Sequence, residues 1–468
     1  MLFSSITFIF IFLPATIALN LIVPERFRNV ILLVASLFFY AWGEPVYVIL
    51  MILSIFLNYF CGKEIFENLG EKARAKRSLI WALAANLLLL GFFKYCGFFI
   101  EIVNAVLPVN ISYRELGLPI GISFYTFQAI SYLIDVYRGE VKPQKNILNF
   151  ALYISMFPQL IAGPIVRYID IEEQLRHRKM SPAKFGAGVR FFIIGLSKKV
   201  ILANGMGKIF EEIYGAFSGG TSLYLLTAWI GAAAYALQIY FDFSGYSDMA
   251  IGLGKMFGFE LKKNFDYPYT ANSITDFWRR WHISLSTWFR EYVYIPLGGN
   301  RVSKERHIFN LLVVWTLTGF WHGAAWNFMF WGFYYGIFLI LEKYIWGKWI
   351  EKMPGTIRHL YALVVVLVGW VFFFSTGLQE AFRYLGMMIG IGTKGFAGAV
   401  TVFTLTSHWL LWIAGILGST RLPIRLLNRF GYEASSKWIT DGLYLFLFLI
   451  SISCLITDSF NPFLYFRF

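Results

Sequence analysis

Charged residues are scarce in this sequence. Asp, Glu, Lys and Arg together make up 15% of its 468 residues, whereas a soluble domain has about 25%. Hydrophobic residues reach 58% and aromatic residues 20%, which excludes intrinsic disorder and favours a protein embedded in a membrane. The apolar runs are long and continuous, without the short alternation of membrane β-strands. We therefore expect transmembrane helices rather than a barrel.

Cysteines and common cofactor motifs are also rare or missing. The three cysteines, Cys61, Cys96 and Cys454, are scattered and form no CxxC pair, so the sequence suggests neither a disulfide framework nor a zinc site. It has no phosphate-loop glycine pattern, no metal-ligand spacing and no Gly-x-Ser-x-Gly elbow. We expect no bound metal and no bound cofactor.

Acidic residues are outnumbered by basic ones, and the net charge is +14. The basic residues lie in loops between apolar runs, so the positive-inside bias explains them better than nucleic-acid binding does. The first apolar run, residues 2–23, lacks a basic n-region, and we interpret it as a retained first span rather than a cleaved signal peptide. The charges after it place the N-terminus outside and the basic loop 63–77 in the cytoplasm.

Apolar runs recur along the whole chain. After the first, they cover residues 30–42, 46–60, 79–93, 118–136, 191–202, 223–241, 360–374, 408–417 and 443–455. The segment 147–166 holds Pro158 and Pro164 between two basic stretches, which predicts a re-entrant or broken helix. We find no soluble domain, linker or internal repeat. The sequence predicts one all-α membrane domain over residues 1–468, with roughly ten to twelve helices at about 20 residues per span.

His322 lies in a stretch without charge, because residues 308–341 contain no Asp, Glu, Lys or Arg. One helix of that length would be roughly 50 Å long, whereas the hydrocarbon core is about 30 Å thick. We expect this segment to break or tilt, with Gly319 and Gly323 as the break points. A titratable side chain at that depth indicates function. The structural alternative is a neutral histidine bonded to a neighbouring helix.

His282 belongs to a second unusual segment. Ser273 and Asp276 are typical of a helix start, and Pro296 marks its end. One face of the predicted helix carries Trp278, His282, Leu285 and Phe289. Three arginines lie away from that face: Arg279, Arg280 and Arg290. An amphipathic helix at the membrane interface explains the aromatic and basic residues, but not a histidine on the apolar face.

The remaining polar residues have simpler interpretations. Four of them lie in apolar surroundings, where interhelical hydrogen bonding is favoured: Gln128, Gln159, Asp242 and Asp248. Three histidines in or beside basic loops are interpreted as surface residues: His177, His307 and His359. His408, next to Trp409, is interpreted as an interfacial anchor.

Seven short segments carry a resemblance to a known family. They are PIGISFYTFQ at 119–128, FPQLIAGPI at 157–165, FDFSGYSD at 241–248, WRRWHISLS at 278–286, YIPLGGNR at 294–301, WHGAAW at 321–326 and NPFLYFRF at 461–468. Together, and in this order, they resemble the membrane-bound O-acyltransferase (MBOAT) family, above all its bacterial alginate O-acetyltransferase branch. The two Trp-His motifs are specific as a pair and not singly.

The resemblance implies a helical bundle with re-entrant or broken helices around a central tunnel, in a bacterial inner membrane. It also implies that His322 matches the family's catalytic histidine and His282 its second polar position. Trp278 and Trp281, with the four polar residues named above, are expected to line or support the tunnel. The acceptor is then an extracytoplasmic glycan, alginate-like or another exopolysaccharide, or a separate SGNH-type acetyltransferase. Branches for D-alanylation of teichoic acids and O-acetylation of peptidoglycan share the motifs and remain alternatives.

The expected chemistry is acyl transfer from a cytoplasmic thioester, acetyl-CoA, to a hydroxyl outside. His322 would take the hydroxyl proton, and His282 would orient the thioester or hydrogen-bond the developing oxyanion. Five basic residues could attract the phosphates of CoA: Lys262, Lys263, Arg279, Arg280 and Arg290. Binding to lipid headgroups is the equal alternative for each of them.

Two other functional classes remain open from the sequence. A transporter or flippase would also have broken helices and buried ionisable residues, although we find no inverted repeat. A scaffold for a polysaccharide export complex would need neither histidine. Release of thiol from acetyl-CoA separates an enzyme from both.

Overall fold

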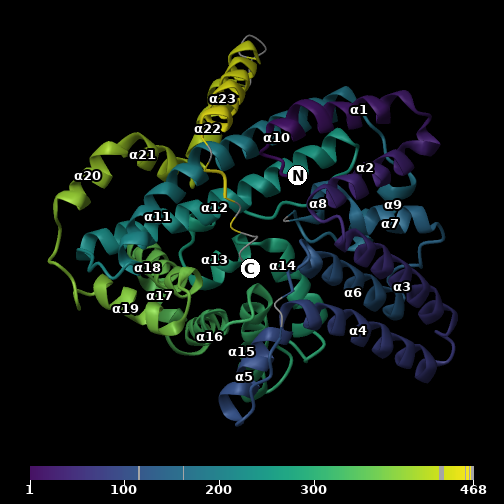
Figure 1. Cartoon of the computed structure of the whole chain (residues 1–468), viewed down its shortest axis with the longest axis horizontal. Coiled ribbons are helices and arrows are strands. Elements are labelled where there is room, and N and C mark those ends of the chain that lie inside the picture. The colour runs from purple at the N-terminus through teal and green to yellow at the C-terminus, as the bar shows by residue number, and fades with distance from the viewer. Residues whose placement is uncertain (114–115, 162, 432–436, 459, 463, 465–468) are drawn as a thin grey trace. The chain divides into compact units, whose positions relative to one another are not determined.

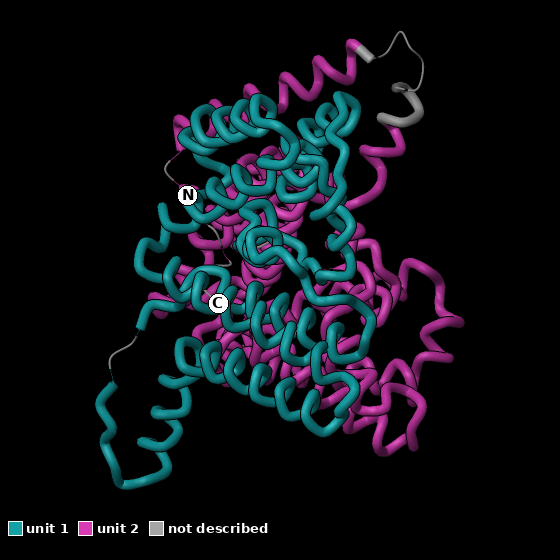
Figure 2. The backbone as a smooth tube through the Cα atoms, turned by 90° about the vertical axis from the view of Figure 1, so that its right-hand side faces the viewer, with its two compact units in different colours: residues 1–192, 249–262 teal, residues 193–248, 263–468 magenta. Residues whose placement is uncertain are grey.

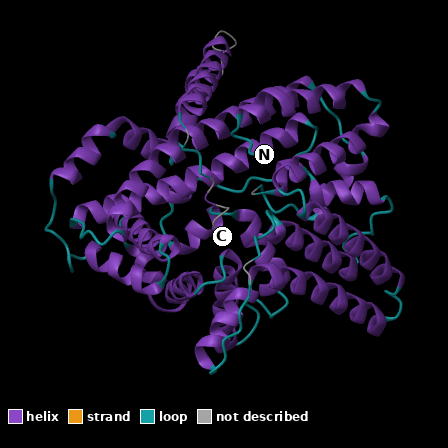
Figure 3. Cartoon of the chain, in the orientation of Figure 1, coloured by secondary structure: helices purple, strands orange, loops and turns teal. Residues whose placement is uncertain are grey.

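The computed structural model describes residues 1–113, 116–161, 163–431, 437–458, 460–462 and 464, and every regular element in them is helical (Figures 1 and 3). The prediction of an all-α protein is confirmed. The chain divides into two compact units, coloured separately in Figure 2. Unit 1 comprises Met1–Phe192 and Met249–Lys262, and unit 2 comprises Ile193–Asp248 and Lys263–Phe468.

Unit 1 contains the N-terminal helices, in which α3 packs against α4 and α6, and α2 packs against α7. Its elements, with short π- and 3₁₀-helical turns labelled η, are η1 Phe8–Phe12, α1 Leu13–Ile22, η2 Glu25–Phe27, α2 Arg28–Gly43, α3 Tyr47–Glu67, α4 Lys72–Lys94, α5 Cys96–Val106, α6 Ile122–Arg138, α7 Ile147–Ser155, α8 Phe157–Leu160 and α9 Tyr168–Arg176. Two further helices have residues in both units: α10 Pro182–Ser197 and α12 Leu225–Met256.

Unit 2 contains the remaining helices, among which α15 and α16 form the most extensive pair and α16 also packs against α18 and α13. Its elements are η3 Lys198–Ala203, α11 Asn204–Ser218, η4 Pro268–Thr270, α13 Ile274–Arg280, α14 Ile283–Phe289, η5 Arg290–Tyr294, α15 Lys304–His322, α16 Trp326–Leu341, η6 Glu342–Trp346, α17 Gly347–Lys352, α18 Gly355–Phe374, α19 Leu378–Met388, α20 Ala399–Ser407, α21 Trp409–Gly418, α22 Leu422–Gly431 and α23 Lys437–Thr457.

Four described helices are each long and apolar enough to cross a membrane: α3, α4, α18 and residues Trp438–Thr457 of α23. The pair α20 and α21, bent by 65° at the break between them, would make a fifth span. The first apolar run forms a shorter helix, Phe8–Ile22. These spans are fewer than the ten to twelve predicted, because several apolar runs are divided between shorter helices.

The segment 147–166 is one of these divided runs. Helix α7 ends at Ser155, Met156 leaves the helical region with ψ 112°, and α8 is a single turn that begins at Phe157. Pro158 lies in the first turn of α8, where proline needs no backbone hydrogen-bond partner. The predicted broken helix is confirmed.

Candidate active site

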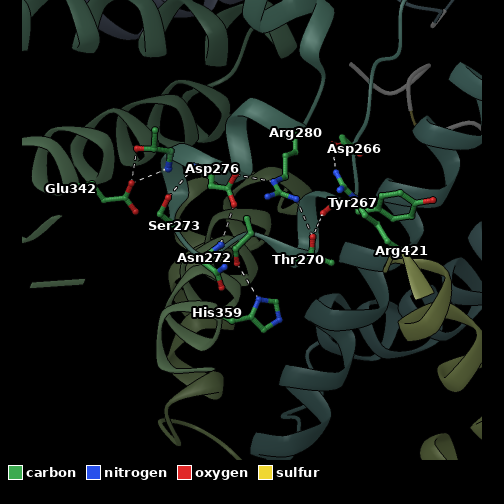
Figure 4. Close-up of polar contacts among 12 residues, drawn as sticks. Asp266, Tyr267, Thr270, Asn272, Ser273, Asp276, Arg280, Glu342, His359 and Arg421 are labelled. Atoms are coloured by element: carbon green, nitrogen blue, oxygen red, sulfur yellow. Dashed lines mark hydrogen bonds and ion pairs between the residues drawn. The ribbon is translucent and has the colours of Figure 1, made fainter. Parts of the chain in front are cut away.

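Helix α13 begins where the sequence predicts it (Figure 4). The Ser273 side chain caps the helix by accepting a hydrogen bond from the backbone N–H of Asp276 at 3.0 Å. The buried carboxylate of Glu342 accepts from the backbone N–H of Ile274 at 2.6 Å and of Thr275 at 2.9 Å. These bonds satisfy backbone N–H groups that have no partner within the helix, and the helix N-terminus favours the negative charge of Glu342. Both the Ser273 cap and Glu342 therefore hold the start of this helix.

The helix does not continue to Pro296, so the prediction of one uninterrupted helix is wrong. It stops at Arg280, and α14 starts at Ile283. Between them, His282 adopts a left-handed backbone with φ 44°, which is uncommon for a residue other than glycine. A neighbouring loop supplies the alternative hydrogen bonds: Asp266 N–H donates to the Arg280 carbonyl, and Ile283 N–H donates to the Asn264 carbonyl, each at 2.9 Å.

A cavity of about 450 Å³ lies beside this break, within unit 2, and both His282 and His322 line it. The other lining residues are Thr275, Trp278, Arg279, Trp281, Ile283, Leu285, Ser286, Thr287, Phe289, Arg290, Tyr294, Leu311, Val314, Trp315, Thr318 and Leu339. The four residues predicted to share a helix face all line it, although the helix is broken. Arg279 and Arg290, predicted to lie away from that face, line it as well.

His322 is the last residue of α15 and is 7% exposed. Its imidazole is edge-on to the rings of Trp331 at 5.1 Å and Phe373 at 5.2 Å between centroids. The chain turns extended at Gly323, so the predicted break at this glycine is confirmed. Gly319 lies inside α15 and is not a break point. It lets α16 approach, because a Cβ there would overlap the carbonyl oxygen of Phe328.

His282 is 1% exposed. Its ring is edge-on to Phe243 at 4.7 Å and lies 6.1 Å from the ring of Trp321, which also packs against His322 at 5.0 Å. One indole therefore touches both imidazoles. The Nδ1 atom of His282 faces Asn264 Oδ1 at 3.3 Å, while its buried Nε2 atom has no hydrogen-bond partner among the described residues.

Comparison with known proteins decides the family. Residues 143–385, more than half of the chain and including both histidines, match the family model MBOAT, membrane-bound O-acyltransferase family. The chain is 38% identical to a probable alginate O-acetylase of Azotobacter vinelandii over the full length of both proteins. The chain belongs to the membrane-bound O-acyltransferase family. It is an O-acyltransferase and a membrane protein.

Other relatives show how the family's acceptors vary. The acyltransferase is 38% identical to a peptidoglycan O-acetyltransferase of Helicobacter pylori, over 84% of this chain and 80% of that one. It is 27% identical to a teichoic acid D-alanyltransferase of Bacillus subtilis, over 59% of this chain and 74% of that one. The names of the three relatives give two acyl groups, acetyl and D-alanyl, and three acceptors, alginate, peptidoglycan and teichoic acid.

The five basic residues predicted to bind the donor separate into two groups. Arg279 and Arg290 line the cavity of the acyltransferase, and both are exposed. Arg290 is also ion-paired, with Glu291 at 2.7 Å. The other three do not line it and are ion-paired with nearby carboxylates at 2.6 to 2.8 Å: Lys262 with Asp170 in unit 1, Lys263 with Asp266, and Arg280 with Asp276. A role in donor binding stays a prediction for all five, with Arg279 and Arg290 the better placed.

The predicted tunnel residues also separate. Trp278 and Trp281 line the cavity, and the buried Nε1 of Trp278 has no described hydrogen-bond partner. Two aspartates are not in the lining and form ion pairs with the adjacent turn η3: Asp242 with Lys199 at 2.7 Å and Asp248 with Lys198 at 2.6 Å. The hydrogen bonding between elements predicted for these two residues is therefore present as charged pairs, and Asp242 also accepts from the Leu464 backbone N–H at 2.9 Å.

The two glutamines lie in unit 1. Gln159 donates from Nε2 to the Tyr153 carbonyl at 2.5 Å, which links α8 to α7, while the buried Gln128 Oε1 has no described partner. Neither is among the residues that line the histidine cavity of unit 2. Any function for them stays a prediction.

One surface assignment among the histidines is wrong. His307 is 2% exposed, and its ring nitrogens lie 2.7 Å from the Tyr294 hydroxyl and 2.8 Å from the Tyr344 hydroxyl. His177 is exposed as predicted. His359 is half-buried and hydrogen-bonds to the Ala271 carbonyl, and the half-buried His408 lies at the bend between α20 and α21. Of the terminal NPFLYFRF motif, residues 463 and 465–468 lie outside the described residues.

Proposed function

We propose that this acyltransferase moves an acetyl group from cytoplasmic acetyl-CoA to a hydroxyl on the outer side of a bacterial inner membrane. The observation that carries the proposal is that two buried histidines, from the end of α15 and from the α13–α14 break, line one cavity. Aromatic side chains enclose both rings. Such a site keeps water away from the thioester and strengthens each polar interaction inside it.

The proposed reaction is one acyl transfer. The acceptor oxygen attacks the thioester carbonyl carbon while His322 takes the hydroxyl proton. The tetrahedral intermediate then collapses, the carbon–sulfur bond breaks, and the proton on His322 passes to the departing sulfur. A thiol has a pKa of about 8.5, so its thiolate is a moderate leaving group that needs only this help. His282 contacts the reacting groups from the α13–α14 break.

Donor binding and acceptor access complete the proposal. Arg279, at the cavity, offers a charge to the phosphates of CoA. The donor reaches the cavity from the cytoplasm and the acceptor from outside, so only the acetyl group crosses the membrane. Acetyl-CoA is a substrate here, and the mechanism needs no resident cofactor.

A glycan is the proposed final acceptor. It receives the acetyl group either directly from this protein or through a separate SGNH-type transferase. The full-length similarity to an alginate O-acetylase supports an exopolysaccharide such as alginate. Peptidoglycan is the second candidate, because that relative has the same 38% identity over a somewhat shorter stretch. D-alanyl transfer has weaker support, because the similarity to the D-alanyltransferase is lower and covers less of the chain.

Substitution of His322 tests the proposal. With His322→Ala in the intact protein, we expect glycan acetylation in cells and CoA release by purified protein to fall at least about 100-fold, the size of a lost general base. His282→Ala should give a smaller but still large loss. His177→Ala, which changes an exposed histidine in unit 1, is the matched control and should keep wild-type rates. Unimpaired acetylation by His322→Ala at normal protein levels would remove the mechanism.

A further inference from the structure

The two ring nitrogens of His282 have different surroundings. Nδ1 lies 3.3 Å from Asn264 Oδ1 and 3.4 Å from Ser284 Oγ. Nε2 is buried and has no hydrogen-bond partner among the described residues. His282 lines the cavity. A neutral imidazole carries its single proton on one of these nitrogens. The position of that proton decides whether Nε2 donates or accepts a hydrogen bond in the cavity.

The orientation of the Asn264 amide settles where the proton lies. The backbone N–H of Ser284 points at Oδ1 from 3.0 Å, and the Ser284 hydroxyl lies 2.9 Å from the same atom. A backbone N–H can only donate, so the Asn264 atom that it meets must be the carbonyl oxygen and not the amide nitrogen. That oxygen can only accept, and therefore the Nδ1 atom facing it bears the proton. Nε2 is left with a lone pair.

The backbone holds Asn264 in this position. Asn264 is 1% exposed, and its own carbonyl accepts from Ile283 N–H at 2.9 Å, directly after His282. The same loop is held further on by Asp266, which pairs with Lys263 at 2.6 Å. Asp266 also pairs with Arg421 at 2.6 Å (Figure 4). The left-handed backbone of His282 is strained. Such a conformation persists only where the surrounding contacts hold it in place, as the bonds to Asn264 do here.

No charged side chain packs directly against the ring among the described residues. Phe243 of α12, Phe265 of the loop and Trp321 of α15 enclose it. The titratable or charged residues that share its cavity are Arg279, Arg290, Tyr294 and His322. The break between two seven-residue helices is outside every helix able to span a membrane. Burial lowers the pKa of the His282 imidazole, so the ring is neutral near pH 7.

We propose that Asn264 is a positioning residue that holds the His282 proton on Nδ1 and thereby presents the Nε2 lone pair to the cavity as an acceptor. The inference rests on the proposed acyl transfer and deepens it. His282 then accepts a hydrogen from an O–H or N–H group of a substrate. The oxyanion-donor role considered from the sequence does not fit the neutral ring in this tautomer.

Two substitutions test the proposal in purified full-length protein in liposomes, with acetyl-CoA as the probe and CoA release as the readout across pH 5 to 9. Asn264→Ala frees the ring to take the wrong tautomer, so we expect kcat to fall by about 10- to 100-fold, with the KM for acetyl-CoA little changed. Asn264→Asp keeps an acceptor at Nδ1 and should stay within about tenfold of wild type at pH 8.

The pH profile distinguishes positioning from a merely structural role. A carboxylate beside Nδ1–H stabilises the imidazolium and raises the pKa of His282. Burial lowers the pKa of His282 to about 3, so in the wild type this ring is protonated only below the measured range. The protonated ring has no lone pair, and a carboxylate that raises its pKa by about 1–3 units should bring the acidic limb of kcat/KM in Asn264→Asp up into that range. Asn310→Ala is the control. It removes another buried amide of unit 2, bonded to the Leu297 and Gly299 carbonyls, and its acidic limb should stay in place.

Each outcome decides the matter. A wild-type kcat in Asn264→Ala, or an unmoved acidic limb in Asn264→Asp, overturns the inference even when His282→Ala and His322→Ala are inactive. If Asn264→Ala does not accumulate, Asn264→Asp decides alone. Wild-type activity of both histidine variants would instead reject the proposed function.

Discussion

Arg279 and Arg280 are adjacent on α13 but have different surroundings. Arg280 donates to Asp276 at 2.8 Å and to the Thr270 hydroxyl at 3.3 Å, so its charge is engaged within the helix and the preceding turn. Arg279 lines the cavity, is exposed, and forms no ion pair with any other described residue. An arginine in that position can bind a phosphate without first breaking another contact.

This difference predicts that the same substitution changes the KM for acetyl-CoA at position 279 but not at position 280. Arg279→Gln should raise the KM for acetyl-CoA about three- to tenfold at unchanged kcat, because one exposed charge contact is worth about 1 kcal/mol. The effect should shrink as salt is added. Arg280→Gln, the control, should lower thermal stability slightly and leave the KM as in wild type. Steady-state CoA release at two ionic strengths measures both, and equal KM values in the two variants would contradict the assignment.

The sequence predicts some residues of this site and not others, for physical reasons. His322 is identifiable because a titratable side chain in a long uncharged run is costly. His282 is identifiable because it departs from an otherwise ordinary amphipathic pattern. Asn264 gives no such signal, since a polar residue that follows two lysines is typical of any loop. Asn264 and His282 are 18 residues apart in the sequence, and only the fold brings their side chains into contact.

At the scale of elements, the α15–α16 pair shows what glycine spacing does and does not predict. The length of the uncharged run correctly predicts a break, and the break falls at Gly323. Gly319 has the same local signature but continues the helix. Because Gly319 has no side chain, the backbone of α16 packs directly against α15 at this position. Only the helix packed against each glycine shows which one ends α15 and which one lets α16 approach.

Close contact between the two helices makes Gly319→Ala costly. The added methyl group would overlap the carbonyl oxygen of Phe328, a backbone atom that cannot rotate away. We expect a loss of about 1–3 kcal/mol in stability, the usual cost of overpacking, and a lower Tm in detergent. Gly91→Ala in α4 is the matched control, because a Cβ there meets nothing within 4 Å. A Tm for Gly319→Ala equal to that of the control would contradict the packing account.

The α13–α14 break illustrates the limit of local patterns. Residues 274–295 contain neither glycine nor proline, and the spacing of their apolar side chains suits one helix. The fold replaces helical hydrogen bonds by bonds to Asn264 and from Asp266. Long-range partners of this kind outweigh local propensity, so the sequence predicts the residues of the cavity wall better than the path of their backbone.

At the scale of the whole molecule, composition alone predicts a helical membrane protein, which the fold and the family confirm. It does not predict the number of full-length spans, because apolar runs read as single helices are divided by turns at Met156 and Gly323. The broken helices and buried ionisable residues of this acyltransferase are also features of transporters. An acyltransferase and a transporter are therefore better distinguished by following the acetyl group and the CoA moiety of the donor separately than by the architecture.

A doubly labelled donor follows those two halves. Wild-type protein is reconstituted in liposomes with a soluble glycan acceptor inside and acetyl-CoA outside, carrying one label on the acetyl group and another on the CoA moiety. Acyl transfer across the membrane predicts that the acetyl label becomes covalently bound to the enclosed acceptor while the CoA label stays outside as free thiol.

With His322→Ala, neither acetyl transfer nor thiol release should exceed that of empty liposomes. A transporter would carry both labels inward together without thiol release, because nothing in its cycle breaks the carbon–sulfur bond. Entry of both labels in a one-to-one ratio would therefore contradict transmembrane acyl transfer.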